Sequence, residues 1–368
     1  YDECIELMKD LELEDKHYRW QQYDILARSY SVLEQYKKAL LYFREWLDEE
    51  INEEIDDEEK QDREKEEMKR QRIAYILNRK GKSLFDLDRI EEALYCYDEG
   101  LKYNPRNTVL MDCKCEVLNK LHRYDESLRL SDMALEYDEF NARIYINRAE
   151  AMYNLGYFQD ALDCCFEAID IYPYYVEPYI VRAKIYYEYQ RYEDVIKIIE
   201  ETEELEIVDN ECMLMKAMSL IRLNNFNEAE GIWEELIKNI ESENDDDLKG
   251  RVYYEYSYMW LIKNQLDESL KYINLAIECD KNDLANYYLR AYIYRTSNKV
   301  DLALEDYKYT IKLDENNEFT YYQMGLVYRE NNQLEKAKEC FLKVLEINPN
   351  HEDANEELSY LEANEIVE

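Results

Sequence analysis

Histidine, cysteine and carboxylate side chains are the groups in this chain that could catalyse a reaction or bind a metal. The three histidines, His17, His122 and His351, are scattered and have no Cys-x-x-Cys partner, which argues against a zinc site. The sequence has no Gly-rich phosphate loop, no Gly-x-Ser-x-Gly motif and no plausible Cys/His dyad. Its many carboxylates have the spacing of a solvated helix surface. We therefore predict no catalytic residue, no metal site and no cofactor, and a protein that is not an enzyme.

The nine cysteines are an odd number and show none of the spacings of a disulfide framework. Cys96, Cys164 and Cys340 recur at equivalent positions of a repeating pattern, and Cys115 and Cys165 occupy positions expected in a core. Free cysteine is among the most buried residue types. We interpret these residues as reduced packing residues, which are typical of a cytoplasmic protein.

Composition and charge restrict the class of protein further. The chain has 368 residues, of which only 6 are Gly and 4 are Pro, too few for a loop-rich or all-β protein. Its net charge is -39, from 46 basic and 85 acidic residues. Such a surface repels phosphate backbones and anionic lipids. No apolar run reaches 18 residues, so we expect no membrane span. The charge favours a basic or apolar protein partner, and neither nucleic acid nor a membrane.

The elements that must position any binding surface are visible in one segment, Glu318–Asn350. Two apolar runs with helical spacing flank the turn N-N-Q and predict two antiparallel helices. Gly325 and Ala337 are small residues where these helices would cross, and Phe341 supplies bulk beside the crossing. Pro349 ends the second helix, because it lacks an N–H and restricts the residue before it. One hairpin cannot bury its apolar face alone, so copies of it must stack.

The chain supplies these copies at a period of 34 residues, with two longer steps. The units begin at Trp20, Ala74, Thr108, Ala142, Val176, Asn210, Gly250, Leu284 and Glu318. The small position of the first helix holds Ala27, Gly81, Cys115, Ala149, Ala183, Ala217, Ser257, Ala291 and Gly325. That of the second helix holds Ala39, Ala93, Ser127, Ala161, Val195, Ala229, Ser269, Ala303 and Ala337. Residues that tolerate a left-handed C-cap stand between the helices at Gly156, Asn224, Asn264, Asn298 and Asn332.

This pattern resembles the tetratricopeptide repeat, a helix–turn–helix unit, and the match covers about nine tenths of the chain. The resemblance implies an all-α fold, a right-handed α-solenoid (superhelix) of stacked units. Residues 1–19 then form the second helix of a truncated repeat, and residues 20–351 form nine repeats. A charged helical insertion at about 54–73 and an acidic loop insertion at about 244–249 interrupt them. Residues 352–368 form a polar capping helix at the C-terminus.

The two insertions carry different charge patterns. The first has acid–base pairs four residues apart, Glu59–Arg63 and Glu66–Arg70, which support a solvated helix. We interpret it as an exposed charged hairpin, with a partner-docking arm as the alternative. The second contains three adjacent aspartates but lacks the spacing and the glycine of an EF-hand, so we predict no cation site there.

In the tetratricopeptide family the first helix of each unit lines a concave groove that binds extended peptides or helices, so the resemblance implies a groove here. In the C-terminal third, the positions that would face it are rich in Tyr and Arg, the residue types that dominate binding hot spots. The candidate peptide-binding residues are Arg251, Tyr254, Tyr258, Tyr288, Tyr292, Arg295, Phe319, Tyr322 and Arg329. Packing is the alternative role for these rings, because the chain has 38 tyrosines.

The N-terminal half of the predicted groove is more polar. It contains Asn78, Lys82, Asp112, Glu116, Arg143, Asn147 and Glu150. Some family members grip the C-terminal carboxylate of chaperones with a clamp of Lys and Asn side chains. Here Asn78 and Lys82 stand in the opposite order, and Cys113 replaces an Asn. Glu116 and Glu150 would repel a carboxylate, so we predict no clamp of this kind.

We therefore expect a non-catalytic scaffold that binds a peptide or helical segment of a partner protein in its concave groove. The ligand would carry apolar and basic residues, and the acidic exterior would make its association sensitive to salt. The oligomeric state is left open. Two alternatives remain: a peptide-sensing regulatory solenoid, or the docking arm of a larger protein whose catalytic or DNA-binding domain precedes Tyr1.

Overall fold

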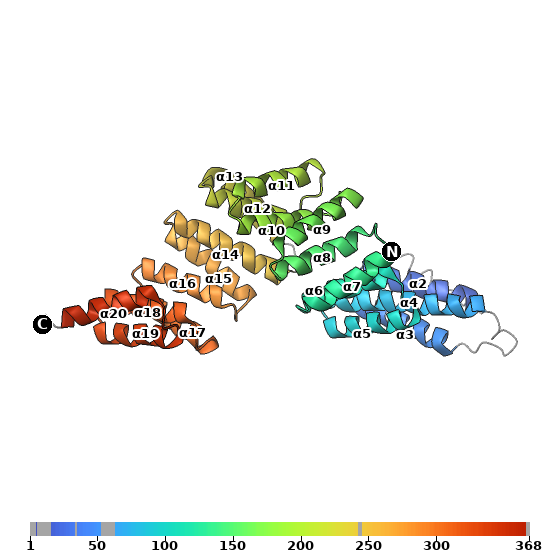
Figure 1. Cartoon of the computed structure of the whole chain (residues 1–368), viewed down its shortest axis with the longest axis horizontal. Helices are drawn as coiled ribbons and strands as arrows, with labels where there is room; N and C mark the ends of the chain where they lie inside the picture. Colours follow the sequence, from blue (N-terminus) through green and yellow to red (C-terminus); the bar gives the residue numbers. More distant parts are fainter. Residues whose placement is uncertain (1–4, 6–15, 34, 53–62, 242–244, 366–368) are drawn as a thin grey trace. The chain divides into compact units, whose positions relative to one another are not determined.

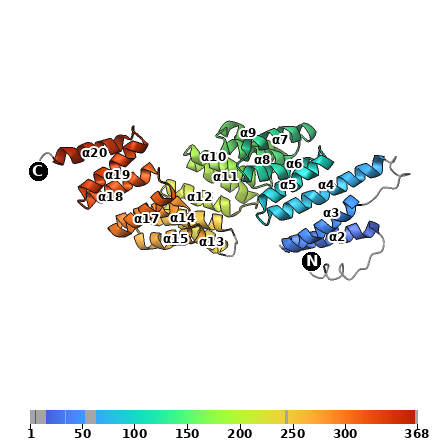
Figure 2. The same ribbon diagram turned by 90° about the horizontal axis from the view of Figure 1, so that it is seen from below.

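The structure is a computed structural model, and it describes residues 5, 16–33, 35–52, 63–241 and 245–365. Throughout this part of the chain the regular secondary structure is α-helical, which confirms the predicted all-α class. The helices follow one another as antiparallel pairs (Figures 1 and 2). We use the helix labels of Figure 1 from here on.

The chain divides into two units, Tyr1–Val208 and Asp209–Glu368, which we call the N-terminal unit and the C-terminal unit. The helices of the N-terminal unit are α2 (Lys16–Val32), α3 (Tyr36–Asn52), α4 (Arg63–Phe85), α5 (Ile90–Tyr103), α6 (Thr108–Lys120), α7 (Tyr124–Tyr137), α8 (Ala142–Asn154), α9 (Phe158–Ile171), α10 (Glu177–Glu188) and α11 (Tyr192–Glu204). Those of the C-terminal unit are α12 (Asn210–Arg222), α13 (Phe226–Ile240), α14 (Asp246–Ile262), α15 (Leu266–Cys279), α16 (Leu284–Thr296), α17 (Val300–Leu313), α18 (Glu318–Glu330), α19 (Leu334–Ile347) and α20 (Glu352–Glu365).

Each unit is a stack of hairpins in chain order. Partners such as α8 and α9, or α14 and α15, pack against each other, and the second helix of a hairpin contacts the first helix of the next, as α7 contacts α8. First helices also contact their successors, as α6 contacts α8 and α12 contacts α14. Both units are therefore helical repeat solenoids. We call the exposed side of the layer of first helices the inner face.

The crossing of the two helices in a hairpin depends on small side chains. Ala149 on α8 and Ala161 on α9 are both 0% exposed, as the repeat pattern predicts. At Gly325 on α18, an added Cβ would lie 2.5 Å from Cε1 of Phe341 on α19. Phe341 is itself fully buried, so its ring has little room to move. The absence of a side chain at Gly325 is thus what allows the aromatic ring to fill this crossing.

Left-handed residues end the first helix of many hairpins. All five predicted C-cap residues have positive φ, from 56° at Asn332 to 81° at Gly156, which confirms the prediction. After Asn332, the N–H of Gln333 donates to the carbonyl oxygen of Tyr328 at 2.8 Å, the bond that closes such a helix end. Four further residues that were not predicted share this conformation, namely Asp88, His122, Gln190 and Glu206.

The start of α14 corrects one prediction. The acidic loop predicted at about 244–249 is wrong over residues 246–249, which are helical, while residue 244 lies outside the described part. Asp245 caps the helix, because its Oδ1 accepts the N–H of Leu248 at 3.0 Å. The next two aspartates lie in the first turn, where the helix dipole favours negative charge. Over residues 246–249 the insertion therefore lengthens a helix and does not form a loop.

The other predicted additions are described only in part. Most of residues 1–19, the insertion up to residue 62, and residues 366–368 lie outside the described residues. From residue 63 the insertion is helical as the beginning of α4, and the predicted pair there is present, with Arg70 Nη2 3.2 Å from Glu66 Oε1.

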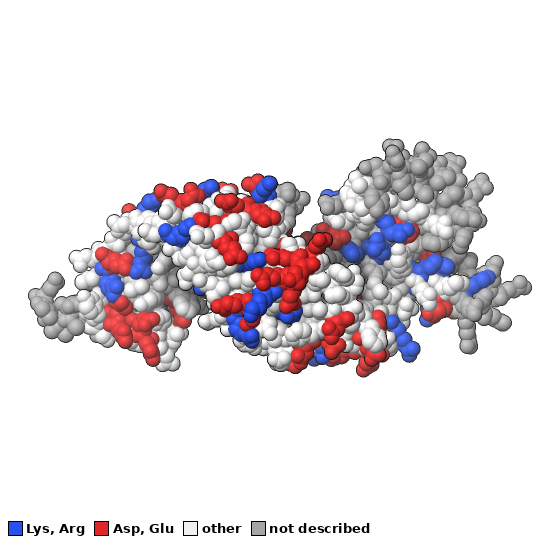
Figure 3. Space-filling model, turned by 90° about the horizontal axis from the view of Figure 1, so that it is seen from above, with Lys and Arg blue, Asp and Glu red and all other residues white. Residues whose placement is uncertain are grey.

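Surface charge and buried thiols agree with the composition. On the face drawn in Figure 3, Asp and Glu gather in patches and Lys and Arg are scattered among them. The described cysteines are free, and burial raises the pKa of Cys115, Cys164 and Cys340 to about 11, so these thiols stay protonated at neutral pH. No helix in the described part of the chain is long and apolar enough to cross a membrane.

The crossing at Gly325 makes the first testable prediction. Gly325→Val should lower the free energy of unfolding by about 1–3 kcal/mol, because the new side chain overlaps the buried ring of Phe341. Gly231 on α13 is the matched control, since an added Cβ meets nothing within 4 Å there. Gly231→Val should change stability by less than about 0.5 kcal/mol. Urea denaturation followed by circular dichroism measures both, and equal effects at the two sites would contradict the packing argument.

Candidate functional site

The nine predicted peptide-binding residues all lie on three first helices of the C-terminal unit. Arg251, Tyr254 and Tyr258 are on α14, Tyr288, Tyr292 and Arg295 on α16, and Phe319, Tyr322 and Arg329 on α18. These helices belong to the layer that forms the inner face, but their side chains differ in what they contact. The arginines, the packed tyrosines and the exposed rings form three groups.

The arginines are bound to carboxylates of neighbouring first helices. Arg251 forms two bonds with Glu211 on α12, Nη1 to Oε2 at 3.0 Å and Nη2 to Oε1 at 2.8 Å. Arg295 pairs with Glu330 on α18, with Nε 3.0 Å from Oε2. Arg329 pairs with Glu357 on α20. These ion pairs link neighbouring repeats, and the last one links α18 to α20. The guanidinium groups therefore stabilise the stacking of the solenoid.

Four of the candidate tyrosines are half-buried and pack against other side chains. Burial raises the pKa of Tyr254 to about 12, with nearby acids adding to the effect. The ring of Tyr258 lies under the guanidinium of Arg222, 5.2 Å from the ring centre, and its hydroxyl accepts a bond from Arg222 Nη1 at 3.3 Å. Tyr288 lies edge-on to Tyr307 with 5.9 Å between ring centres. For these rings the packing role that the sequence left open is the one the contacts support.

Tyr322 packs in the same manner, and two candidate rings remain prominently exposed. The ring of Tyr322 is 5.9 Å from that of Phe341 and 5.1 Å from that of His351. By contrast, Tyr292 is 41% exposed and Phe319 is 63% exposed. These two rings offer apolar area to a partner without any rearrangement of the core.

A cavity lies beside the more exposed ring. It has a volume of ≈ 290 Å³ and is lined by residues of α16, α17 and α18 and of the turn before α18, namely Leu284, Ala285, Tyr288, Thr310, Asn317, Phe319 and Thr320. Only Tyr288 and Phe319 were predicted as site residues. The others were missed because they are ordinary positions near helix ends, and their common cavity depends on how neighbouring hairpins stack.

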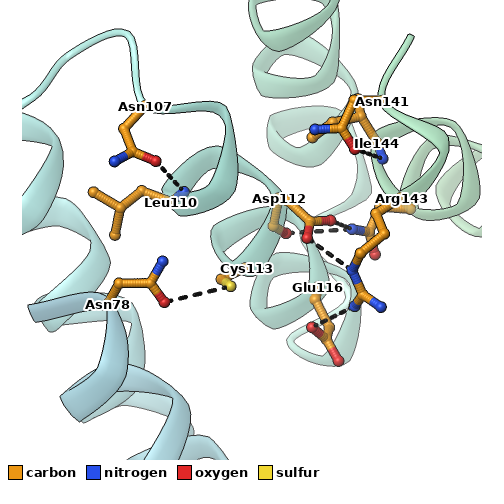
Figure 4. Close-up of polar contacts among 10 residues, drawn as sticks. Asn78, Asn107, Leu110, Asp112, Cys113, Glu116, Asn141, Arg143 and Ile144 are labelled. Atoms are coloured by element: carbon orange, nitrogen blue, oxygen red, sulfur yellow. Dashed lines mark hydrogen bonds and ion pairs between the residues drawn. The ribbon is translucent and has the colours of Figure 1, made fainter. Parts of the chain in front are cut away.

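The inner face of the N-terminal unit has a different character (Figure 4). Buried Asp112 on α6 accepts bonds from two residues of α8, Arg143 Nε at 2.9 Å and Asn147 Nδ2 at 2.7 Å. Arg143 also approaches Glu116, with Nη2 3.5 Å from Oε2. The polar residues that the sequence placed here are therefore brought together, and they satisfy one another.

The neighbouring amides of this face also form hydrogen bonds. Asn78 Oδ1 accepts a bond from the thiol of Cys113 at 3.8 Å (Figure 4). Asn119 Nδ2 donates to the carbonyl oxygen of Asn147 at 2.8 Å and to Glu150 Oε2 at 3.2 Å. Asn78 is therefore engaged with the residue that replaces the clamp asparagine.

Burial makes these carboxylates harder to ionise. Desolvation raises the pKa of Asp112, Glu116 and Glu150 above their ordinary values, although Arg143 opposes the shift at Asp112 and Glu116 and Asn119 opposes it at Glu150. Ionised at neutral pH, they would repel an anionic ligand. The cation beside them, Arg143, is already paired with Asp112 and Glu116. This face therefore presents fewer unpaired groups for binding a partner than the inner face of the C-terminal unit.

A second cavity of ≈ 410 Å³ lies between α2, α3 and α4, with Trp46, Met68 and Tyr75 in its walls. Its carboxylate, Asp24, accepts a bond from the hydroxyl of Tyr75 at 3.2 Å and pairs with Arg28 at 2.7 Å. Both oxygens of Asp24 thus have partners. Among the described residues, no group of three or more His, Cys, Asp or Glu side chains is placed to hold a metal ion.

The architecture defines the class of protein as a helical repeat solenoid. Two segments match the family of the tetratricopeptide repeat, residues 319–351 and residues 74–107. No curated protein matches the chain. The period, the small crossing residues and these two matches agree, and the chain is a tetratricopeptide-repeat protein.

Similar folds occur among solved structures. A chain in the crystal structure of the APC/C hetero-tetramer Cut9–Hcn1 aligns with a TM-score of 0.63 and 14% identity, over 98% of this chain and 66% of the solved one. A tetratricopeptide repeat protein from Parabacteroides merdae aligns with a TM-score of 0.38 and 18% identity, over 79% of this chain and 99% of that one. The first likeness shows a shared fold, and the second is too low in TM-score to add an argument.

The raised pKa values predict a pH dependence of stability. Glu116 has a raised pKa when folded, so its ionised form costs stability at neutral pH, and that cost is relieved as the pH falls through the folded pKa towards the ordinary value of 4.5. Glu116→Gln should therefore raise the melting temperature at pH 7.5. Lowering the pH from 7.5 to 5.5 should raise the melting temperature of this variant less than that of the unmodified chain.

Glu126 on α7 is the matched control, because its pKa is shifted in the opposite direction from that of Glu116. A hydrogen bond from Arg123 lowers the pKa of Glu126, so Glu126→Gln should leave the melting temperature at pH 7.5 unchanged or slightly lower. Thermal unfolding followed by circular dichroism at both pH values gives the comparison. If Glu116→Gln melts with the same pH dependence as the unmodified chain, burial is not the cause of the shift.

Proposed function

We propose that this chain is a non-catalytic protein-interaction scaffold that binds a peptide or helical segment of a partner protein on the inner face of the C-terminal unit. The observation that carries the proposal is the exposure of Tyr292 and Phe319, at 41% and 63%, beside a cavity on that face. Large rings of this kind contribute much of the binding energy of protein interfaces, because they bury a large area and lose little conformational entropy.

The supporting contacts argue for a preorganised surface. The pairs Arg251–Glu211, Arg295–Glu330 and Arg329–Glu357 tie successive first helices together. A surface that is held before binding loses less entropy when a partner docks, so more of the contact energy appears as affinity. Of the nine predicted residues, we therefore assign contact with the partner to the exposed rings and a positioning role to the arginines.

The kind of partner follows from charge. The chain carries a net charge of -39, so a basic or apolar segment associates faster than an acidic one, and added salt slows its association. The solved chain of similar fold belongs to a crystallised hetero-tetramer. At 14% identity that likeness extends to the fold, and the role in this chain is our inference.

Substitution of Tyr292, the exposed ring that does not line the cavity, tests whether the inner face binds a partner. Peptides selected from a displayed random 12-residue library against the unmodified chain should bind Tyr292→Ala at least about fivefold more weakly, since an interface anchor contributes more than 1 kcal/mol. Tyr95 on α5 is the control, a tyrosine that lies on a second helix and is more exposed than Tyr292, at 64% against 41%. Tyr95→Ala should leave the affinity unchanged. Fluorescence anisotropy measures the dissociation constants. If neither substitution changes the affinity of the selected peptides, the inner face is not their binding surface.

A further inference from the structure

We propose that the cavity between α16, α17 and α18 receives one large apolar side chain of a partner segment, and that lysine or arginine flanks that side chain in the partner. This inference rests on the proposed function, because it takes the inner face as the binding surface. It adds the site at which the segment is anchored and the chemistry of the residues that are recognised.

The hydroxyls of the two threonines in the cavity already donate hydrogen bonds within the chain. The hydroxyl of Thr310 donates to the carbonyl oxygen of Tyr307 at 2.8 Å. The hydroxyl of Thr320 donates to Asn317 Oδ1 at 2.9 Å, and the same oxygen accepts the N–H of Thr320 at 3.0 Å. A polar ligand would have to compete with these bonds, whereas an apolar one leaves them intact. The cavity therefore selects an apolar group.

The helix starts at the cavity are capped by side chains, which makes them less favourable for an anion. Both α16 and α18 begin beside it, and free N–H groups at a helix start attract anions. Here Asp283 Oδ1 accepts the N–H of Ala285 at 2.9 Å, and Asn317 caps α18 in the same manner. An acidic side chain or a C-terminal carboxylate of the partner would find these donors occupied and would lie next to Asp283.

The walls supply the apolar surface. Leu284, Ala285 and Tyr288 of α16 face Phe319 of α18 across the cavity. A volume of ≈ 290 Å³ lies at the small end of ligand sites, which span about 300–1,000 Å³, so the space suits one bulky side chain and not a large cofactor. Phe319 is 63% exposed, and a side chain of the partner in the cavity would bury most of this exposed area.

The charges of the segments that border the cavity select the flanking residues. Between residues 280 and 284 and between residues 312 and 320, acids outnumber bases: Asp280, Asp283, Asp314, Glu315 and Glu318 against Lys281 and Lys312. A partner with lysine or arginine on either side of its apolar anchor complements this rim. A second copy of the chain carries the same net charge of -39 and would be repelled, so we assign the cavity to a different, basic partner segment.

The experiment compares peptide binding to the unmodified chain with binding to a variant in which a tryptophan side chain fills the cavity. The probe is a fluorescent nonapeptide, Ala-Lys-Ala-Lys-Phe-Lys-Ala-Lys-Ala, and its counterpart with a central Ala. We expect the Phe peptide to bind the unmodified chain at least about tenfold more tightly than the Ala peptide, the difference that burial of one aromatic side chain provides. Ala285→Trp should abolish this difference, because Ala285 is exposed and the indole would occupy the cavity.

Two further variants separate cavity, charge and fold. Leu302→Trp places the same residue at an exposed position of α17 outside the cavity and should leave peptide affinity unchanged. Asp283→Asn keeps a capping side chain and removes the charge, so it should weaken the Lys-flanked peptide severalfold, and the effect should vanish in 0.5 M salt. Circular dichroism and melting temperature establish that each variant is folded.

The outcomes distinguish this inference from the proposed function. If the Phe and Ala peptides bind equally, or if Ala285→Trp retains the preference for Phe, the assignment of the cavity is wrong, while library peptides that lose affinity with Tyr292→Ala would still support the inner face. If no peptide of either origin depends on an inner-face residue, both proposals fail. Sedimentation that shows self-association lost in Ala285→Trp would identify a second copy of the chain as the occupant and overturn the basic-segment assignment.

Discussion

The close crossing of two helices within each hairpin is the contact on which the rest of the structure depends. At Gly81 and Gly325, an added Cβ would lie 2.5 Å from the rings of Tyr97 and Phe341. Those rings fill the space that the missing side chains leave, and both are almost completely buried. Because a single hairpin has no core of its own, a crossing that opened would also disturb the contacts with the hairpins on either side.

One hairpin meets this constraint with polar groups in place of an aromatic ring. In α6 and α7 the crossing contains Cys115, Ser127 and Ser131, all fully buried. The hydroxyl of Ser131 donates to the carbonyl oxygen of Ser127 at 2.8 Å and lies 3.5 Å from the sulfur of Cys115. Each buried polar atom thus has a partner, so this departure from the repeat pattern does not leave an unsatisfied group.

The two units present contrasting inner faces on the same repeat geometry. In the N-terminal unit, Arg143 is shared between Asp112 and Glu116, and desolvation raises the pKa of both carboxylates. In the C-terminal unit the ion pairs lie between helices and leave Tyr292 and Phe319 exposed. Apolar surface without a partner inside the chain is the feature that distinguishes a binding face from a structural one.

The features that depend on local, periodic chemistry could be predicted from the amino-acid sequence. The hairpins, the buried small residues such as Ala149 and Ala161, and the left-handed caps such as Asn332 could all be predicted, because each depends on residue size or backbone freedom at a fixed place in the repeat. The cap at Asp245 was missed and the segment after it was predicted as a loop, although the aspartates there carried a helix-start signal.

Which candidate residues are available to a partner depends on contacts between hairpins, and the sequence pattern does not show these contacts. Arg251, Arg295 and Arg329 sit where the repeat pattern places them, yet their carboxylate partners lie 28 to 40 residues away on other helices. The cavity beside Phe319 likewise arises from α16, α17 and α18 together. A repeat period specifies the direction in which a side chain projects, whereas its burial and its bonds depend on the side chains of the neighbouring hairpin, which vary independently of that period.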